Sequence, residues 1–431
     1  MVTLALWVAA CLVLAWVLRR RPVWLVALVV LLWTALPAVA GYRLNGVGVR
    51  SPIGFHPATW LAIVAFVVQM LWNPLPLLRT VSRHPYLGLV VGLFVFGAGI
   101  TSVLSDTGGA RLLADQIVAP LLLALLVVTH ADRAGQLLLR NVVLVAAAAQ
   151  SVLSLVQTAF GSIIFFADDF ATNTWFNPAR FDRWMGTTDS PLVLSLLLCA
   201  AAALTLGLRS NAARFSLLVL FSASTLVTQS RLGGMVMLAV LVLAVFRTRV
   251  SVWTRLLTAG GLVAAVIWLE SSGLAGGLLS RLQNDTGSSQ ARERAARFFL
   301  GEWSDVFLSG HGLTASYQVA RDAGLQTSIE SSVLMYAIDV GVILAALYFG
   351  AQALILLRYG LSGWLGGVFL SGVILLVLQN GSSALAFANL TGTLNWIILG
   401  LVMAGYSTRR KELAQRSGAP AATSLATSVS S

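Results

Sequence analysis

Residues 86–104 read YLGLVVGLFVFGAGITSVL and contain no charged side chain. A helix of about 20 apolar residues matches the roughly 30 Å hydrocarbon core of a bilayer. Because hydrocarbon offers no hydrogen-bond partner to an unpaired backbone, a chain that crosses it forms helices or a closed barrel. The stretch lacks the alternating pattern of barrel strands, so it predicts a transmembrane helix.

Similar stretches recur along the whole chain, about 13 in all. Besides 86–104, they lie near residues 3–18, 23–40, 58–77, 112–129, 141–166, 191–208, 214–230, 232–247, 256–271, 331–357, 362–380 and 393–407. Hydrophobic residues make up 58% of the chain and charged residues 10%, with a mean hydropathy of +0.86. Soluble domains carry about 25% charged residues. We therefore predict an all-α fold, a polytopic integral membrane helix bundle with about 12–14 transmembrane helices.

One long polar segment interrupts this pattern. Residues 272–330 form a predicted large extracytoplasmic loop, which carries Arg281, Arg292, Arg294, Arg297 and Arg321. The chain then divides into N-terminal helices (1–140), a membrane region that includes the loop (141–407) and a tail (408–431). The tail is rich in Ser, Ala and Thr and is predicted to be a disordered cytoplasmic segment.

The basic residues predict the orientation, because Lys and Arg near helix ends are retained in the cytoplasm. If Arg19, Arg20 and Arg21 lie inside, the alternate inside loops hold 17 of the 28 basic residues. Of the loop acids, only Asp132 and Glu412 then fall inside. The N-terminus and the loop are therefore expected outside, in the periplasm or at the cell exterior, and the C-terminus inside.

Several functions are disfavoured by composition and spacing. The four histidines are scattered without ligand-like spacing, so no metal site is predicted. The net charge of +12 is dispersed over short loops, which argues against nucleic acid as a partner. A transporter would carry ionisable residues within its helices. Asp339 is the one clear case, so a transporter or an exporter of lipid-linked glycans stays an alternative.

Arginines occur at three places on the predicted outer side: Arg180 and Arg183, then Arg231, then the cluster from Arg281 to Arg297. Guanidinium groups bind phosphate oxygens in bidentate fashion, which suits a diphosphate at the bilayer surface. Arginines can also anchor a helix end at the lipid headgroups. Arg231 lies between two predicted helices with almost no loop, at a depth where an unpaired charge costs a few kcal/mol. This position favours a functional role.

Four short motifs follow one another along residues 180–405: RWMGTTDSP from Arg183, TQSRLG from Thr228, GHG from Gly310 and SIESSVLMYAIDVG ending at Gly341. Their order, with the Arg-bearing loop between the second and third, resembles the O-antigen ligase and Wzy-type polysaccharide polymerase superfamily. The resemblance implies an enzyme that uses no metal, nucleotide or other cofactor. Its donor would be a glycan on undecaprenyl diphosphate, held by Arg231, by Arg292 or Arg294 and by Arg183, with Arg180, Arg281 and Asp339 in support.

The sequence departs from the family pattern at Glu330. The typical element H-N-x-x-L-x-x-L-x-E-x-G aligns with residues 330–341, so glutamate replaces the histidine. A carboxylate can accept a proton from an acceptor hydroxyl, which makes Glu330 the catalytic candidate. It could instead stabilise a helix N-terminus through the helix dipole.

The glutamate favours a polymerase, because the ligases of this superfamily depend on the histidine more uniformly. The expected reaction is glycan polymerisation in the biosynthesis of an exopolysaccharide, a capsule or an O-antigen. Expected partners are the membrane lipid, a flippase and a chain-length regulator. A ligase that transfers finished glycan to lipid or protein is the alternative within the superfamily.

Overall fold

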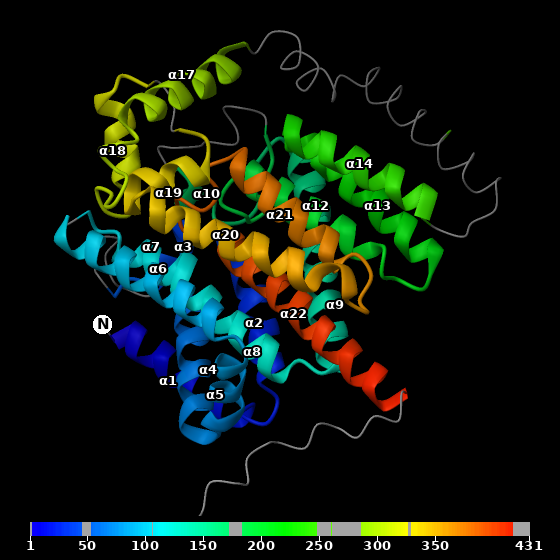
Figure 1. The fold of residues 1–431 in the computed structure, drawn as a ribbon. Helices are drawn as coiled ribbons and strands as arrows, with labels where there is room; N and C mark the ends of the chain where they lie inside the picture. Colours follow the sequence, from blue (N-terminus) through cyan, green and yellow to red (C-terminus); the bar gives the residue numbers. More distant parts are fainter. Residues whose placement is uncertain are drawn as a thin grey trace, which may run out of the picture.

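The computed structural model describes residues 2–44, 53–105, 107–171, 183–247, 260, 286–325 and 329–416. Every regular element in these ranges is a helix (Figure 1), which confirms the predicted all-α class. The predicted helix near 256–271, apart from Gly260, lies outside the described residues, as do residues 417–431 of the tail.

Long apolar helices make this a membrane protein. Five described helices are long and apolar enough to span a bilayer: α6 (Pro85–Leu104), the continuous segment Ala110–His130 that ends in α8 (Ala119–His130), α9 (Arg133–Phe160), α20 (Val342–Tyr359) and α22 (Leu390–Arg416). The pair α4 (Pro57–Trp72) and α5 (Pro74–Arg83) could form a sixth span. Shorter apolar helices are α1 (Val2–Val17), α2 (Pro22–Ala35), α12 (Pro191–Thr205), α13 (Asn211–Val227), α14 (Arg231–Arg247) and α21 (Val368–Asn380). Three short helices, α3 (Ala38–Leu44), α10 (Ala167–Ala171) and the 3₁₀ turn η2 (Gly360–Ser362), lie between them.

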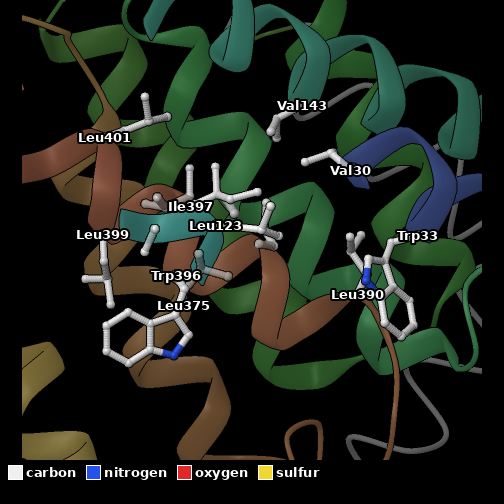
Figure 2. Close-up of a cluster of buried hydrophobic side chains, with 14 of the residues drawn as sticks. Val30, Trp33, Leu123, Val143, Leu375, Leu390, Trp396, Ile397, Leu399 and Leu401 are labelled. Carbon is white, nitrogen blue, oxygen red and sulfur yellow. The ribbon is translucent and has the colours of Figure 1, made fainter. Parts of the chain in front are cut away.

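Helix α22 forms the centre of the bundle, since all its residues from 390 to 405 are buried. Figure 2 shows Leu123 of α8 beside Ile397 of α22, and Val143 of α9 beside Val30 of α2. A Cβ on Gly400 would lie 3.1 Å from Val127 Cβ, so the missing side chain permits the close approach of α8. Within lipid, such close packing is what holds helices together.

The prediction of one continuous helix over 331–357 is wrong, because the helix is interrupted at Gly341. This glycine has a φ of +101° and separates α19 (Ser332–Val340) from α20. A Cβ there would approach the carbonyl oxygen of Leu308 to 2.9 Å. Val342 N–H donates to Val306 O at 2.9 Å, so the segment around residues 306–308 packs against the break. Glycine tolerates both the dihedral and the contact.

A second predicted span, 58–77, ends early. Helix α4 stops at Trp72, and α5 leaves it at an angle of 101°. Pro74 explains the break, because proline lacks the N–H that would continue the helical hydrogen bonds.

The predicted loop 272–330 contains two helices in its described part. They are α17 (Thr286–Glu302) and α18 (Ala315–Asp322). In Figure 1, α17 and α18 lie together at one end of the bundle and α5 lies at the other. The loop is therefore a folded segment over these residues, not an extended connection.

Segments predicted on the same side of the membrane contact each other. Arg43 and Asp169, both in predicted outer segments, form an ion pair at 3.0 Å. Arg133 and Glu412, both predicted inside, pair at 3.1 Å. These contacts agree with the alternate assignment of loops to the two ends of the bundle.

The final helix extends beyond the predicted start of the tail at residue 408, since α22 continues to Arg416. Thr408 accepts a hydrogen bond from Gln136 at 3.0 Å, and Glu412 binds Arg133. These contacts with α9 hold the polar end of the helix, which consists largely of good helix formers. Residues 408–416 are thus helical.

Candidate functional site

A polar pocket of about 380 Å³ lies where the ends of α12, α14 and α21 meet the segment before α19. It is lined by Arg183, Leu192, Ser195, Leu196, Gln229, Ser230, Arg231, Leu232, Met235, Arg292, Glu330, Leu378, Gly381 and Ser382. Four of the predicted site residues therefore share one cavity: Arg183, Arg231, Arg292 and Glu330. The structure brings them together from four separate parts of the chain.

Arg231 is the first residue of α14, after a tight turn from α13. Gln229 in this turn has a φ of +51°, and Ser230 Oγ accepts the Gly233 N–H at 3.1 Å. A Cβ on Gly233 would fall 1.8 Å from Ser195 Oγ, so α14 starts directly against α12. The absence of a loop and the close helix contact together fix the position of the Arg231 backbone at the pocket.

Arg183 reaches the same pocket from the segment before α12. Its Nε donates to the carbonyl oxygen of Thr228 at 2.9 Å, which ties it to the Arg231 turn. Behind it, Gln157 of α9 bonds both the N–H and the C=O of Gly186 at 2.9 Å. The segment is thus held by side chains of a long helix, and Arg183 is presented from a fixed backbone.

Asp189 anchors the other end of that segment. Its carboxylate is buried and accepts the Ala38 N–H at 2.7 Å. Burial raises the pKa of Asp189 to about 7, although the hydrogen bond from Ala38 lowers it. Desolvation disfavours the charged form, and the backbone N–H groups of Ala38 and Val39 favour it in part.

Arg292 and Glu330 meet across the pocket. Arg292 Nε donates to Glu330 Oε2 at 3.0 Å, and its terminal nitrogen reaches the Gly381 carbonyl oxygen at 3.4 Å. Glu330 has a left-handed φ of +51°, and Ser331 supplies the N-cap of α19. The cap role thus belongs to Ser331, whereas the Glu330 side chain contacts a guanidinium.

Two residues of the pocket lining share an uncommon backbone conformation. Both Gln229 and Glu330 are non-glycine residues with positive φ. Such residues cost on the order of 1–3 kcal/mol and concentrate at functional sites. Their occurrence on the same pocket as three arginines makes this pocket the candidate functional site.

Asp339 does not line the pocket. It is fully buried, and its carboxylate accepts the N–H groups of Thr314 at 3.1 Å and Ser316 at 2.6 Å. Thr314 has a φ of +74° and precedes α18. Asp339 therefore fastens the start of α18 to α19, which is a structural role behind the site.

We expect Asp339→Ala to destabilise the protein, because two buried N–H groups would lose their acceptor. Each unpaired donor costs about 1–3 kcal/mol. Asp322→Ala is the matched control, since Asp322 is exposed at the end of α18, the helix whose start Asp339 holds. Thermal unfolding in detergent should show a clear decrease for Asp339→Ala and little change for Asp322→Ala. Equal melting temperatures would contradict the structural role.

The other predicted residues are placed differently. Arg294 is exposed on α17 and is not part of the pocket lining, so of the two alternatives Arg292 is the one at the pocket. Arg180 and Arg281 lie outside the described residues.

The sequence interpretation missed part of the lining, notably Ser195, Gln229, Gly381 and Ser382. One signal was present for the last two. The Asn-Gly-Ser-Ser run at 380–383 follows an apolar stretch and is typical of a turn. Ser195, in contrast, is a single hydroxyl within an apolar helix and carries no such signal.

Among the described residues, no group of three or more His, Cys, Asp and Glu side chains could hold a metal ion. Comparison with models of known protein families gave no match, and comparison with curated proteins gave none either.

Proposed function

We propose that this protein is a polysaccharide polymerase of the bacterial inner membrane. It crosses the membrane about 12–14 times, with its site on the outer face. It transfers glycan from undecaprenyl diphosphate to an acceptor repeat unit. The observation that carries the proposal is the pocket that Arg183, Arg231 and Arg292 line together with one carboxylate, Glu330.

The charge and shape of the pocket support a lipid-linked diphosphate. Three guanidiniums and one carboxylate leave an excess of positive charge, which suits the anionic phosphates. Leu192, Leu196, Met235 and Leu378 supply an apolar wall beside them. Leu192 and Met235 are exposed on the protein surface, at 38% and 59%, where a polyprenyl tail could leave the pocket toward lipid.

The proposed reaction is a displacement at the anomeric carbon of the donor glycan. The bond from this carbon to the diphosphate oxygen breaks, and a bond to the acceptor hydroxyl oxygen forms. Glu330 takes the hydroxyl proton as general base. Arg183, Arg231 and Arg292 stabilise the charge that develops on the departing diphosphate. In this mechanism Arg292 turns from Glu330 to the phosphates when the donor binds, which releases the carboxylate for its role as base.

A transfer assay with purified protein in liposomes tests the proposal. Its substrate is the single carrier-linked repeat unit, isolated from a host strain that lacks this gene and therefore accumulates it. We expect longer carrier-linked glycans together with free undecaprenyl diphosphate. Transfer only to a lipid or protein acceptor would instead indicate a ligase. Movement of the donor across the bilayer without a new glycosidic bond would indicate a transporter.

Reporter fusions test the orientation, which rests on the split of 17 inside to 11 outside basic residues. We expect alkaline phosphatase to be active when fused at residue 300 and inactive when fused at the C-terminus. A cytoplasmic reporter should give the opposite pattern at both positions. If the C-terminal alkaline phosphatase fusion were active and the fusion at residue 300 inactive, the orientation would be the opposite of the predicted one.

A further inference from the structure

A second cavity of about 370 Å³ lies among α5, α6, α8, α20 and α22. Its lining is almost wholly apolar and includes Leu121, Leu125, Trp396 and Met403. It shares no lining residue with the arginine pocket. The reaction proposed above does not use it.

The cavity is a slot along one face of α6. This helix contributes Leu87, Gly88, Val91, Gly92 and Val95, which span about 12 Å at 1.5 Å per residue. A Cβ on Gly92 would meet nothing within 4 Å, so the slot is open at this point. The slot is shorter than half of the roughly 30 Å hydrocarbon core, a length that fits a chain from one leaflet.

One end of the slot is positively charged. His84, at the junction of α5 and α6, lines it and forms a hydrogen bond of 3.1 Å with the Tyr359 hydroxyl. Burial is the largest cause that lowers the pKa of His84, and repulsion from Arg358 and Arg83 lowers this pKa further. Arg83 directly precedes His84, and the Arg358 guanidinium lies 5.6 Å from the centre of the Tyr359 ring, whose hydroxyl bonds His84. Both arginine side chains are exposed.

We propose that this slot binds an anionic phospholipid, with one acyl chain along α6 and the phosphate at Arg83 and Arg358. An apolar slot alone would accept any acyl chain. The two guanidiniums add the charge that selects an anionic headgroup. They also lie in segments predicted to be cytoplasmic, where anionic lipids attract basic residues. The inference is independent of the proposed function.

Native mass spectrometry of the purified protein tests this site. The probe is an equal mixture of dioleoyl phosphatidylglycerol and dioleoyl phosphatidylcholine in detergent. Wild-type protein should retain phosphatidylglycerol in preference to phosphatidylcholine. Arg83→Gln and Arg358→Gln should each lower this preference about fivefold, from the usual contribution of one basic residue near an anionic lipid. Both residues are exposed, so these variants should fold.

A slot-filling variant tests the acyl-chain position. Gly92→Leu places a side chain in the slot and should remove retention of both lipids. Gly350→Leu is the matched control, because Gly350 is also a helical glycine with nothing within 4 Å but does not line the cavity. It should retain lipid as the wild type does. Equal retention of the two lipids by wild-type protein, or unchanged retention by Gly92→Leu, would overturn the proposal. Preferential retention of an added polyprenyl phosphate over phosphatidylglycerol would also overturn it.

Discussion

Glu330→Gln is expected to slow glycan transfer by about 10²–10⁴-fold, the usual contribution of a general base. Glutamine keeps the shape of the side chain but cannot accept the hydroxyl proton. The backbone at this position has a φ of +51°, and the substitution leaves that strain essentially unchanged. Carrier-linked repeat units should accumulate in cells that express the variant. Glu330→His should retain part of the activity, since imidazole can also act as a base.

The control for this experiment is Glu302→Gln, an exposed glutamate at the end of α17. It should extend glycan at the wild-type rate. Normal chain extension by Glu330→Gln would remove Glu330 from the mechanism.

The ion pair with Arg292 allows a second interpretation, in which Glu330 only positions that guanidinium. A double-mutant cycle distinguishes the two roles. If Glu330 acts through Arg292, then adding Glu330→Gln to Arg292→Gln should cause no further loss. If Glu330 is the base, the double variant should be slower than either single variant.

Arg231→Lys is expected to lower the transfer rate by about 10²–10³-fold, the cost of removing one preorganised donor to developing negative charge. Lysine keeps the positive charge but loses the planar pair of donors that binds phosphate oxygens. Arg231 begins α14 directly against α12, so the backbone cannot shift to bring a lysine closer. Protein abundance and melting temperature should stay near those of the wild type, while polymer is lost.

The matched control is Arg321→Lys. Arg321 is exposed on α18, outside the pocket, and bonds to Gln318 at 2.7 Å. Its lysine variant should make polymer of normal length. Wild-type polymer from Arg231→Lys would exclude the role of Arg231 in diphosphate binding.

Part of the candidate site could be predicted from local sequence. Arg231 was identified because two apolar runs leave no room for a loop between them, and this is a property of neighbouring residues. The choice between Arg292 and Arg294 could not be made in this way. Both lie on one helix, and only the packing of α17 against the segments before α19 and after α21 places Arg292 at the pocket.

The sequence alone determined the class of this protein. In apolar runs such as 86–104, the backbone N–H and C=O groups find hydrogen-bond partners within the hydrocarbon only when the run is a helix. The sequence also assigned the loops to two ends, since basic residues follow helix ends. Only the tertiary structure decided that Arg183, Arg231, Arg292 and Glu330 share a pocket, and that Asp339 supports α18 instead. Hydropathy is a property along the chain, whereas these contacts depend on the rotation and depth of each helix. Those are set by side-chain packing between segments far apart in the sequence.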